Sequence, residues 1–202
     1  VLCVEAIDAK FIQAFWNFIQ AGQYAIGEKS TGKKQFYRFK EPAIHGFPAM
    51  LELFSRRPDL PGLANDSRLT PIPADDAASS LSAILLDDDY YHFIMENRIV
   101  IEGLSLVSPV ALIVLKAKAW MDLDDRRTNG EKVDSKNISK HKNDIARIVP
   151  VVSAEPIPLP PSIHQDMRVF LTRLSLERID VKALDIPLSM DEIKNALAII
   201  LG

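Results

Sequence analysis

The amino-acid sequence predicts an α+β fold, in which a small β-sheet comes first and a helical lobe follows it. Short apolar runs bounded by turn residues dominate the first half of the chain, whereas apolar residues at helical spacing dominate the second half. The two kinds of element do not alternate as in βαβ units, and no repeat is evident. We therefore expect a sheet core over residues 1–107 and a helical lobe over residues 108–202.

The composition is that of an ordinary globular protein. The 202 residues are 48% hydrophobic and 25% charged, with 24 Lys and Arg against 27 Asp and Glu. These values exclude collagen, a long disordered chain and a highly charged nucleic-acid coat protein. No apolar run approaches the roughly 20 residues that a membrane-spanning helix needs. The single cysteine, Cys3, excludes an internal disulfide, so we expect a cytoplasmic protein.

The first half begins with an expected strand over residues 1–5, an apolar run rich in β-branched side chains with no visible start. Because the chain also opens with Val1 rather than Met, we expect an N-terminal truncation. A helix is expected from Asp8, a plausible N-cap, to Gly22, a natural C-cap. Further short strands are expected at residues 24–26, 36–39, 50–55, 68–73, 81–86 and 99–103. For residues 68–73 and 81–86, the alternative is a connecting segment without strand structure.

One glycine-rich turn resembles a phosphate-binding P-loop in its spacing, with Gly27, Gly32 and Lys33 at the expected intervals. A P-loop requires Ser or Thr after the lysine to bind Mg²⁺, but Lys34 stands there. It must also open a helix, whereas residues 35–39 have the pattern of a strand. The sequence therefore excludes a P-loop and predicts the long loop of a β-hairpin.

The second half is expected to be mainly helical. Ser108 and Pro109 form an N-cap followed by proline at the first helical position, and the helical pattern then runs to about Arg127. Further helices are expected over residues 135–152, over residues 162–176 and after Ser189. Five prolines between positions 150 and 161 predict a stiff, non-helical connection.

Glu52 is the first candidate functional residue. If residues 50–55 form a strand, Glu52 shares one face with Met50 and Phe54, and an unpaired carboxylate among apolar groups is unfavourable. A metal ion or a partner cation would relieve that cost. The alternatives are a strand end near solvent or an ion pair with an arginine such as Arg38 or Arg56.

A cluster of basic residues is the second candidate. Residues 116–147 contain nine Lys or Arg and six Asp or Glu, so this segment has a net charge of +3 while the remainder has −6. Such a cluster on two neighbouring helices could hold phosphates. The alternative is a pair of solvated helix faces with many ion pairs. The four histidines show no metal-ligand spacing, and Asp122 and Asp124 diverge by about 200° on a helix.

Four segments together resemble the AbiEii (abortive infection) group of nucleotidyltransferases, within the DNA-polymerase-β-like superfamily. They are residues 36–39, 50–56, 115–120 and 140–145. The resemblance spans roughly residues 1–150. It implies a small mixed β-sheet core that precedes a helical C-terminal lobe, and transfer of NMP from an NTP to an acceptor hydroxyl that is RNA in some members. It also implies a toxin of a bacterial toxin-antitoxin system, with a cognate antitoxin protein as partner.

By this resemblance Glu52 is the catalytic, Mg²⁺-binding carboxylate on the strand beside an Asp-x-Asp pair. Lys116 would reach the triphosphate, and Lys140 and Asp144 would orient or neutralise groups at the lip of the cleft. The sequence lacks the Asp-x-Asp strand of this family, which we expect just upstream of Val1, so two-metal catalysis should fail in this polypeptide. Alternatives are a non-catalytic nucleotidyltransferase-like module that binds a protein and an α+β domain with no nucleotide role.

Overall fold

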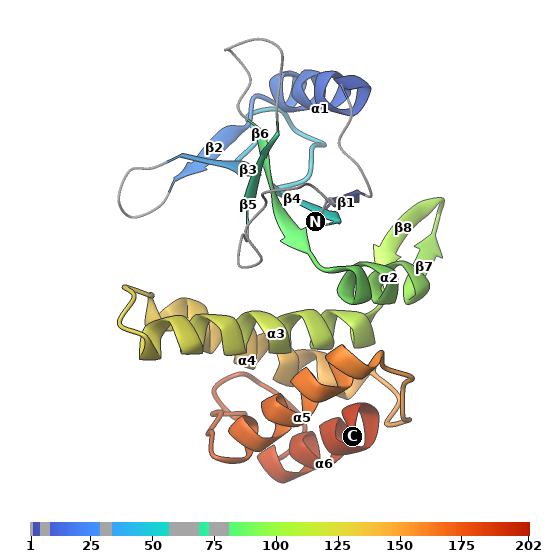
Figure 1. Cartoon of the computed structure of the whole chain (residues 1–202), viewed down its shortest axis with the longest axis vertical. Helices are drawn as coiled ribbons and strands as arrows, with labels where there is room; N and C mark the ends of the chain where they lie inside the picture. Colours follow the sequence, from blue (N-terminus) through green and yellow to red (C-terminus); the bar gives the residue numbers. More distant parts are fainter. Residues whose placement is uncertain (1, 5–8, 29–33, 57–68, 73–80) are drawn as a thin grey trace. The chain divides into compact units, whose positions relative to one another are not determined.

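A computed structural model describes residues 2–4, 9–28, 34–56, 69–72 and 81–202 and contains both a β-sheet and a set of α-helices (Figure 1). The mixed α and β composition that the sequence predicts is confirmed. The chain divides into two compact units, Val1–Tyr91 and His92–Gly202. The dividing point lies within helix α2 (Asp88–Glu96), whereas the expected domain boundary between residues 107 and 108 stays a prediction.

The first unit contains a mixed sheet with β4 (Met50–Arg56) at its centre. Its strand order is β2-β3-β4-β6-β5, and β1 also pairs with β4. Strand β4 is parallel to β1 and β6 and antiparallel to β3. The other strands are β1 (Leu2–Val4), β2 (Ala25–Glu28), β3 (Lys34–Lys40), β5 (Leu69–Ile72) and β6 (Leu81–Leu86). Pro71 lies in β5, an edge strand, where its missing N–H is tolerated.

Helix α1 (Ala9–Gly22) supplies the apolar cover of this sheet. Its buried side chains Phe15 and Ile19 pack into one cluster with Phe39 of β3 and Leu53 of β4. The rings of Phe15 and Phe39 meet edge to face with centroids 5.3 Å apart. The helix ends at Gly22, where a Cβ atom would lie only 2.5 Å from the ring of Tyr24. Glycine is therefore required at this position by close packing.

The strand and helix predictions for the first unit are confirmed where the structure describes them. All six strands correspond to expected runs, and α1 ends at Gly22 as predicted. Lys34 begins strand β3 and not a helix, in agreement with the exclusion of a P-loop. The proposed N-cap Asp8 and the turn residues Gly32 and Lys33 lie outside the described residues.

The second unit begins with the end of α2, after which come a hairpin and four further α-helices. Strands β7 (Arg98–Ile101) and β8 (Leu104–Val107) are joined by Glu102 and Gly103, both with positive φ, as in the tight turns that suit twisted hairpins. The helices are α3 (Pro109–Thr128), α4 (Ser135–Ile148), α5 (Pro161–Ser175) and α6 (Met190–Leu201). Within the described residues, no helix is both long and apolar enough to cross a membrane.

Two details of the second unit differ from the sequence predictions. Strand β8, which pairs with β7, has no counterpart among the strands that the sequence predicts. Helix α4 ends at Ile148 and a single 3₁₀ turn follows over Val149–Val151, whereas the sequence predicted helix through Val152. Pro150 explains the earlier end, because proline has no N–H to donate and its ring obstructs the preceding turn of an α-helix.

Side-chain caps define the starts of α3 and α6. The buried Ser108 hydroxyl accepts a hydrogen bond from the backbone N–H of Ala111 at 3.3 Å, as expected of the predicted N-cap. Ser189 and Glu192 form a reciprocal capping box at the start of α6. The hydrogen bonds from the Ser189 hydroxyl and its backbone N–H hold the pKa of the Glu192 carboxyl below its ordinary value.

We expect Ser108→Ala to lower the free energy of unfolding by about 1 kcal/mol, because it removes the acceptor for one otherwise unsatisfied N–H at the start of α3. Urea unfolding followed by circular dichroism measures the change. Ser108→Thr retains a hydroxyl and should restore most of the loss, while Ser139→Ala, at an exposed position of α4, should have no destabilising effect. Equal stability of the wild type and Ser108→Ala would contradict this role of the cap.

Candidate functional site

Glu52 lies in the middle of β4, on the sheet face opposite its buried neighbours. Leu51, Leu53 and Ser55 are buried, whereas Met50, Glu52 and Phe54 alternate with them and are more exposed. The predicted two-residue alternation is therefore confirmed. The Glu52 side chain is nevertheless only 17% exposed, so its charge requires a nearby partner.

Arg38 of β3 is that partner. The register of the antiparallel pair sets Arg38 directly opposite Glu52. The guanidinium Nε and Nη2 both lie 2.6 Å from Oε1 of the carboxylate. The ion pair named as one sequence alternative is thus confirmed for Arg38. Arg56 instead donates two hydrogen bonds to Asp88, at 2.7 and 3.1 Å.

Both contacts from Arg38 reach the same oxygen of Glu52. Among the described residues, no hydrogen bond to Oε2 is found. A carboxylate held in this way has its orientation set by one oxygen while the other remains open to a further cation. The arrangement is compatible with hard cations such as Mg²⁺, which prefer oxygen ligands.

Lys116 of α3 and Asp144 of α4 form the second part of the candidate site. The Lys116 ammonium donates to Oδ2 of Asp144 at 2.6 Å, and each side chain is 21% exposed. Arg147, one turn later on α4, lies 3.4 Å from the other oxygen, Oδ1. Asp144 therefore lies between two cations, which fixes the position of the lysine ammonium.

Lys140 lies one helical turn before Asp144 on α4. Its side chain is exposed, and no ion pair or hydrogen bond of this lysine is found among the described residues. The structure thus brings Lys116, Asp144 and Lys140 together on two packed helices of the second unit. Glu52 belongs to the first unit.

The remaining basic residues on α3 and α4 are mostly engaged in ion pairs. Lys118 binds Asp166 of α5 at 2.6 Å, and Lys142 binds Glu177 after α5 at 2.5 Å. Six of the nine basic residues in 116–147 have carboxylate partners: Lys116, Lys118, Arg126, Arg127, Lys142 and Arg147. For these six, the alternative of helix faces with many ion pairs is confirmed.

Other chemistry in the described residues is sparse. They contain no group of three or more His, Cys, Asp or Glu side chains that could hold a metal ion. The Cys3 thiol of β1 is partly buried, and burial raises its pKa from 9.0 to about 11. Asp88 and Asp89 lie in the first turn of α2, where their negative charge is favourable to the helix dipole.

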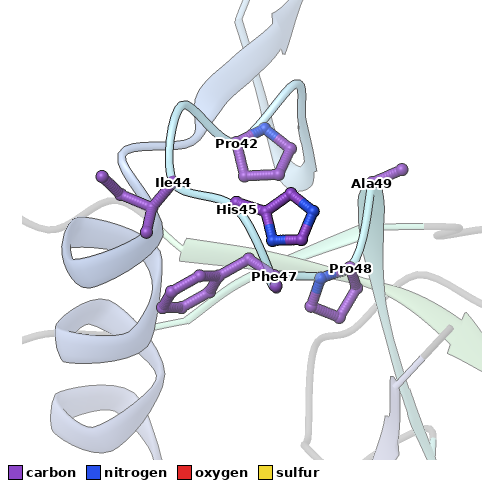
Figure 2. A pocket seen from close by; sticks show the side chains of 7 residues that line it. Pro42, Ile44, His45, Phe47, Pro48 and Ala49 are labelled. Carbon is purple, nitrogen blue, oxygen red and sulfur yellow. The ribbon is translucent and has the colours of Figure 1, made fainter.

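An open hollow of about 640 Å³ lies on the first unit, in the loop between β3 and β4. Figure 2 shows the side chains around it, among them the imidazole of His45. Apolar side chains form most of its lining, with Phe47 packed against Phe18 of α1 at a centroid distance of 5.0 Å. None of the residues that line it was a predicted site residue.

Sequence reasoning did not find Arg147 as a partner of Asp144, or Asp88 as the partner of Arg56. The i, i+3 spacing of Asp144 and Arg147 was available as a signal, since such residues are neighbours on a helix. The pairing of Arg56 with Asp88 joins a strand to a helix 32 residues later, and spacing alone contains no signal for it. Comparisons with protein-family models, with curated proteins and with solved structures find no match.

We expect Lys116 and Asp144 to show coupled effects on stability. In a double-mutant cycle with Lys116→Met and Asp144→Asn, the interaction energy should be about 1 kcal/mol, because both groups are largely shielded from solvent. Urea unfolding of the four proteins gives this value. The more exposed pair Arg127 and Asp124 should give a smaller coupling in the same assay. Strict additivity at Lys116 and Asp144 would contradict the expectation.

The Cys3 thiol should react slowly with alkylating reagents. A pKa of about 11 instead of 9.0 reduces the thiolate fraction near neutral pH about 100-fold, and the thiolate is the reactive species. Iodoacetamide labelling followed by mass spectrometry gives the rate, which should rise continuously up to about pH 11. The urea-unfolded chain is the control and should react like free cysteine. Equal rates for the folded and unfolded chains would contradict the assigned environment.

Proposed function

We propose that the protein is a nucleotidyltransferase of the AbiEii type, which transfers NMP from an NTP to a hydroxyl of an RNA acceptor. One observation carries the proposal. Strands β1 and β4 are parallel, with Leu2 opposite Leu53, so Glu52 lies at the level where β1 begins. Strand β3 already pairs with β4 from Met50 to Glu52, so an Asp-x-Asp pair just upstream of Val1 would have to turn away from that edge of β4. The proposed chemistry requires that pair to approach Glu52 from there.

The state of the Glu52 carboxylate supports a role in holding Mg²⁺. Arg38 orients Oε1, and no hydrogen bond to Oε2 is found in the described part of the chain. Glu52 would then supply one ligand through Oε2, and the paired acids would supply the others. Bound Mg²⁺ would offset the charge of the triphosphate and of the displaced pyrophosphate. Arg38 remains paired to the carboxylate, which keeps the open oxygen aimed in one direction.

Lys116 suits a role in binding the triphosphate. Its ammonium is held by Asp144, which is itself shared with Arg147. An ammonium with one carboxylate contact retains donors for phosphate oxygens, since lysine has three N–H groups. Lys140, which is exposed and has no partner among the described residues, would add positive charge one turn away. Asp144 therefore positions the Lys116 ammonium, Lys116 contacts the triphosphate, and Lys140 neutralises charge at the lip of the cleft.

The proposed biological setting follows from the same resemblance. The protein would act as the toxin of a bacterial toxin-antitoxin system, in the cytoplasm, with a cognate antitoxin protein as its partner. The 202-residue polypeptide by itself would be inactive, because it supplies only the Glu52 carboxylate of the three that this mechanism uses.

A second candidate function is a non-catalytic, nucleotidyltransferase-like module that binds a protein. Two observations favour it. Arg38 already neutralises Glu52, and hairpin β7–β8 exposes an apolar face. Ile99, Ile101 and Leu106 lie on that face and are 40%, 52% and 43% exposed. Exposed apolar faces of this kind are typical of protein contacts.

Incorporation of label from each [α-³²P]NTP into bulk RNA tests the proposed reaction. The protein used should be the product of the full open reading frame that contains this chain, with Mg²⁺ present. We expect transfer by the wild type and at least a 100-fold loss in Glu52→Gln, which keeps the shape of the side chain but removes its charge. Asp88→Asn breaks a comparable arginine-carboxylate pair in the same unit and should retain transfer.

Two outcomes would contradict the reaction. Transfer by Glu52→Gln at the wild-type rate would show that the Glu52 carboxylate has no catalytic role. Absence of transfer with all four NTPs would favour the non-catalytic module, and co-purification of a protein whose binding is lost in Ile101→Lys would then support that alternative. A separate measurement of ATP and Mg²⁺ binding by calorimetry should show at least a tenfold weakening in Lys116→Met.

A further inference from the structure

Three lysines at the start of α4 have no charge partner among the residues that the structure describes. Lys132 lies just before the helix, and Lys136 and Lys140 lie on its first two turns. All three are exposed, and none makes an ion pair or a side-chain hydrogen bond to another described residue. Of the nine basic residues in 116–147, these are the three for which the described residues show no ion pair. We call Lys132, Lys136 and Lys140 the lysine row.

The two helical members of the row share one face. Residues four apart lie on the same face of a helix, so Lys136 and Lys140 project from one side of α4 with a separation of about 6 Å along its axis. Lys132 lies in the non-helical segment just before α4, and exposed Arg147 lies two turns beyond Lys140. A separation of this size is close to that of successive phosphates along a nucleic-acid strand.

The stability of the helix does not explain the row. Positive charge near a helix N-terminus is unfavourable, because the helix dipole is positive there. Helices α2 and α6 follow the favourable pattern, with Asp88 and Asp89 in one and Asp191 and Glu192 in the other. Helix α4 has no acidic residue in its first turn.

The carboxylates near the row leave it with excess positive charge. Glu131 is paired with Arg126, and Asp144 is paired with Lys116 and Arg147. Asp134 is the N-cap and accepts a hydrogen bond from the backbone N–H of Lys136 at 2.9 Å. Its charge offsets one of the three lysines, so the surface retains a net positive charge that faces solvent.

We propose that the lysine row binds the phosphodiester backbone of a single-stranded nucleic acid, which is the acceptor RNA if the proposed transferase function holds. Each ammonium contacts a phosphate oxygen, and successive phosphates follow the axis of α4. Because the contacts are to the backbone, binding is independent of base sequence and releases counterions. Lys116 is paired internally and does not belong to this surface.

Fluorescence anisotropy with a labelled 20-nucleotide single-stranded RNA tests the row directly. The triple variant Lys132→Gln, Lys136→Gln, Lys140→Gln should bind at least tenfold more weakly near 100 mM salt. Its plot of log K against log salt should be shallower by about 2, because each lost phosphate contact in a single strand contributes about 0.7 to the slope. The circular dichroism spectrum should be unchanged, since the three side chains are exposed.

A charge-matched control separates the row from a general effect of net charge. Arg168→Gln, Arg178→Gln and Lys182→Gln remove three positive charges from exposed positions elsewhere in the same unit and should preserve RNA binding. A DNA strand of the same sequence should bind through the row as well, since the backbone phosphates are shared. If the RNA binds more tightly than the DNA, the protein makes added contacts to the 2′-hydroxyl groups, and the assignment of the lysine row to the phosphates still holds.

Several results would overturn the proposal. They are absence of RNA binding by the wild type, equal binding by the triple variant, or an equal loss in the control variant. Retained RNA binding by the triple variant together with lost binding to phosphatidylglycerol vesicles would assign the surface to lipid instead. The assay uses no NTP, so a failure of NMP transfer with intact RNA binding would reject the transferase and leave the row in place.

Discussion

The two-residue alternation along β4 is the constraint on which the first unit depends. It places Leu51 and Leu53 in the core beneath α1 and turns Glu52 to the other face, where Arg38 lies opposite because of the β3–β4 register. A shift of one residue in that register would exchange the two faces and bury the carboxylate. Core packing and the position of the candidate carboxylate therefore have one cause, and neither can change without the other.

Charge in the second unit is distributed according to what each residue contacts. Where α3, α4 and α5 approach one another, basic side chains meet carboxylates across the helices, as Lys118 meets Asp166 and Arg173 meets Asp125. On the solvent side at the start of α4, the lysines have no such partners in the described part of the chain. The net charge of the whole segment hides this division, because paired and unpaired lysines count equally in a sum.

Much of the fold follows from local sequence signals. Ser108 before Pro109 predicts the start of α3 correctly, and the helix expected after Ser189 is α6, because helix starts depend on neighbouring residues. The sequence pattern did not predict β8, which has only four residues. It also predicted α4 to continue beyond Ile148, whereas the helix ends there because of Pro150. The candidate site was only partly predictable. Arg38 could be named as a possible partner of Glu52, but choosing it over Arg56 required the strand register, which is a property of tertiary structure.

The pairing of β1 with β4 has a consequence for how the chain folds. Leu2 meets Leu53 across some fifty intervening residues, whereas α3 and α4 are close in sequence as well as in space. Because closing a long loop loses more chain entropy before any contact forms, helix pairs assemble quickly and distant strands join late. During synthesis from the N-terminus, β1 must remain unpaired until β4 has left the ribosome, and nascent-chain proteolysis should find the N-terminal strand sensitive until that point.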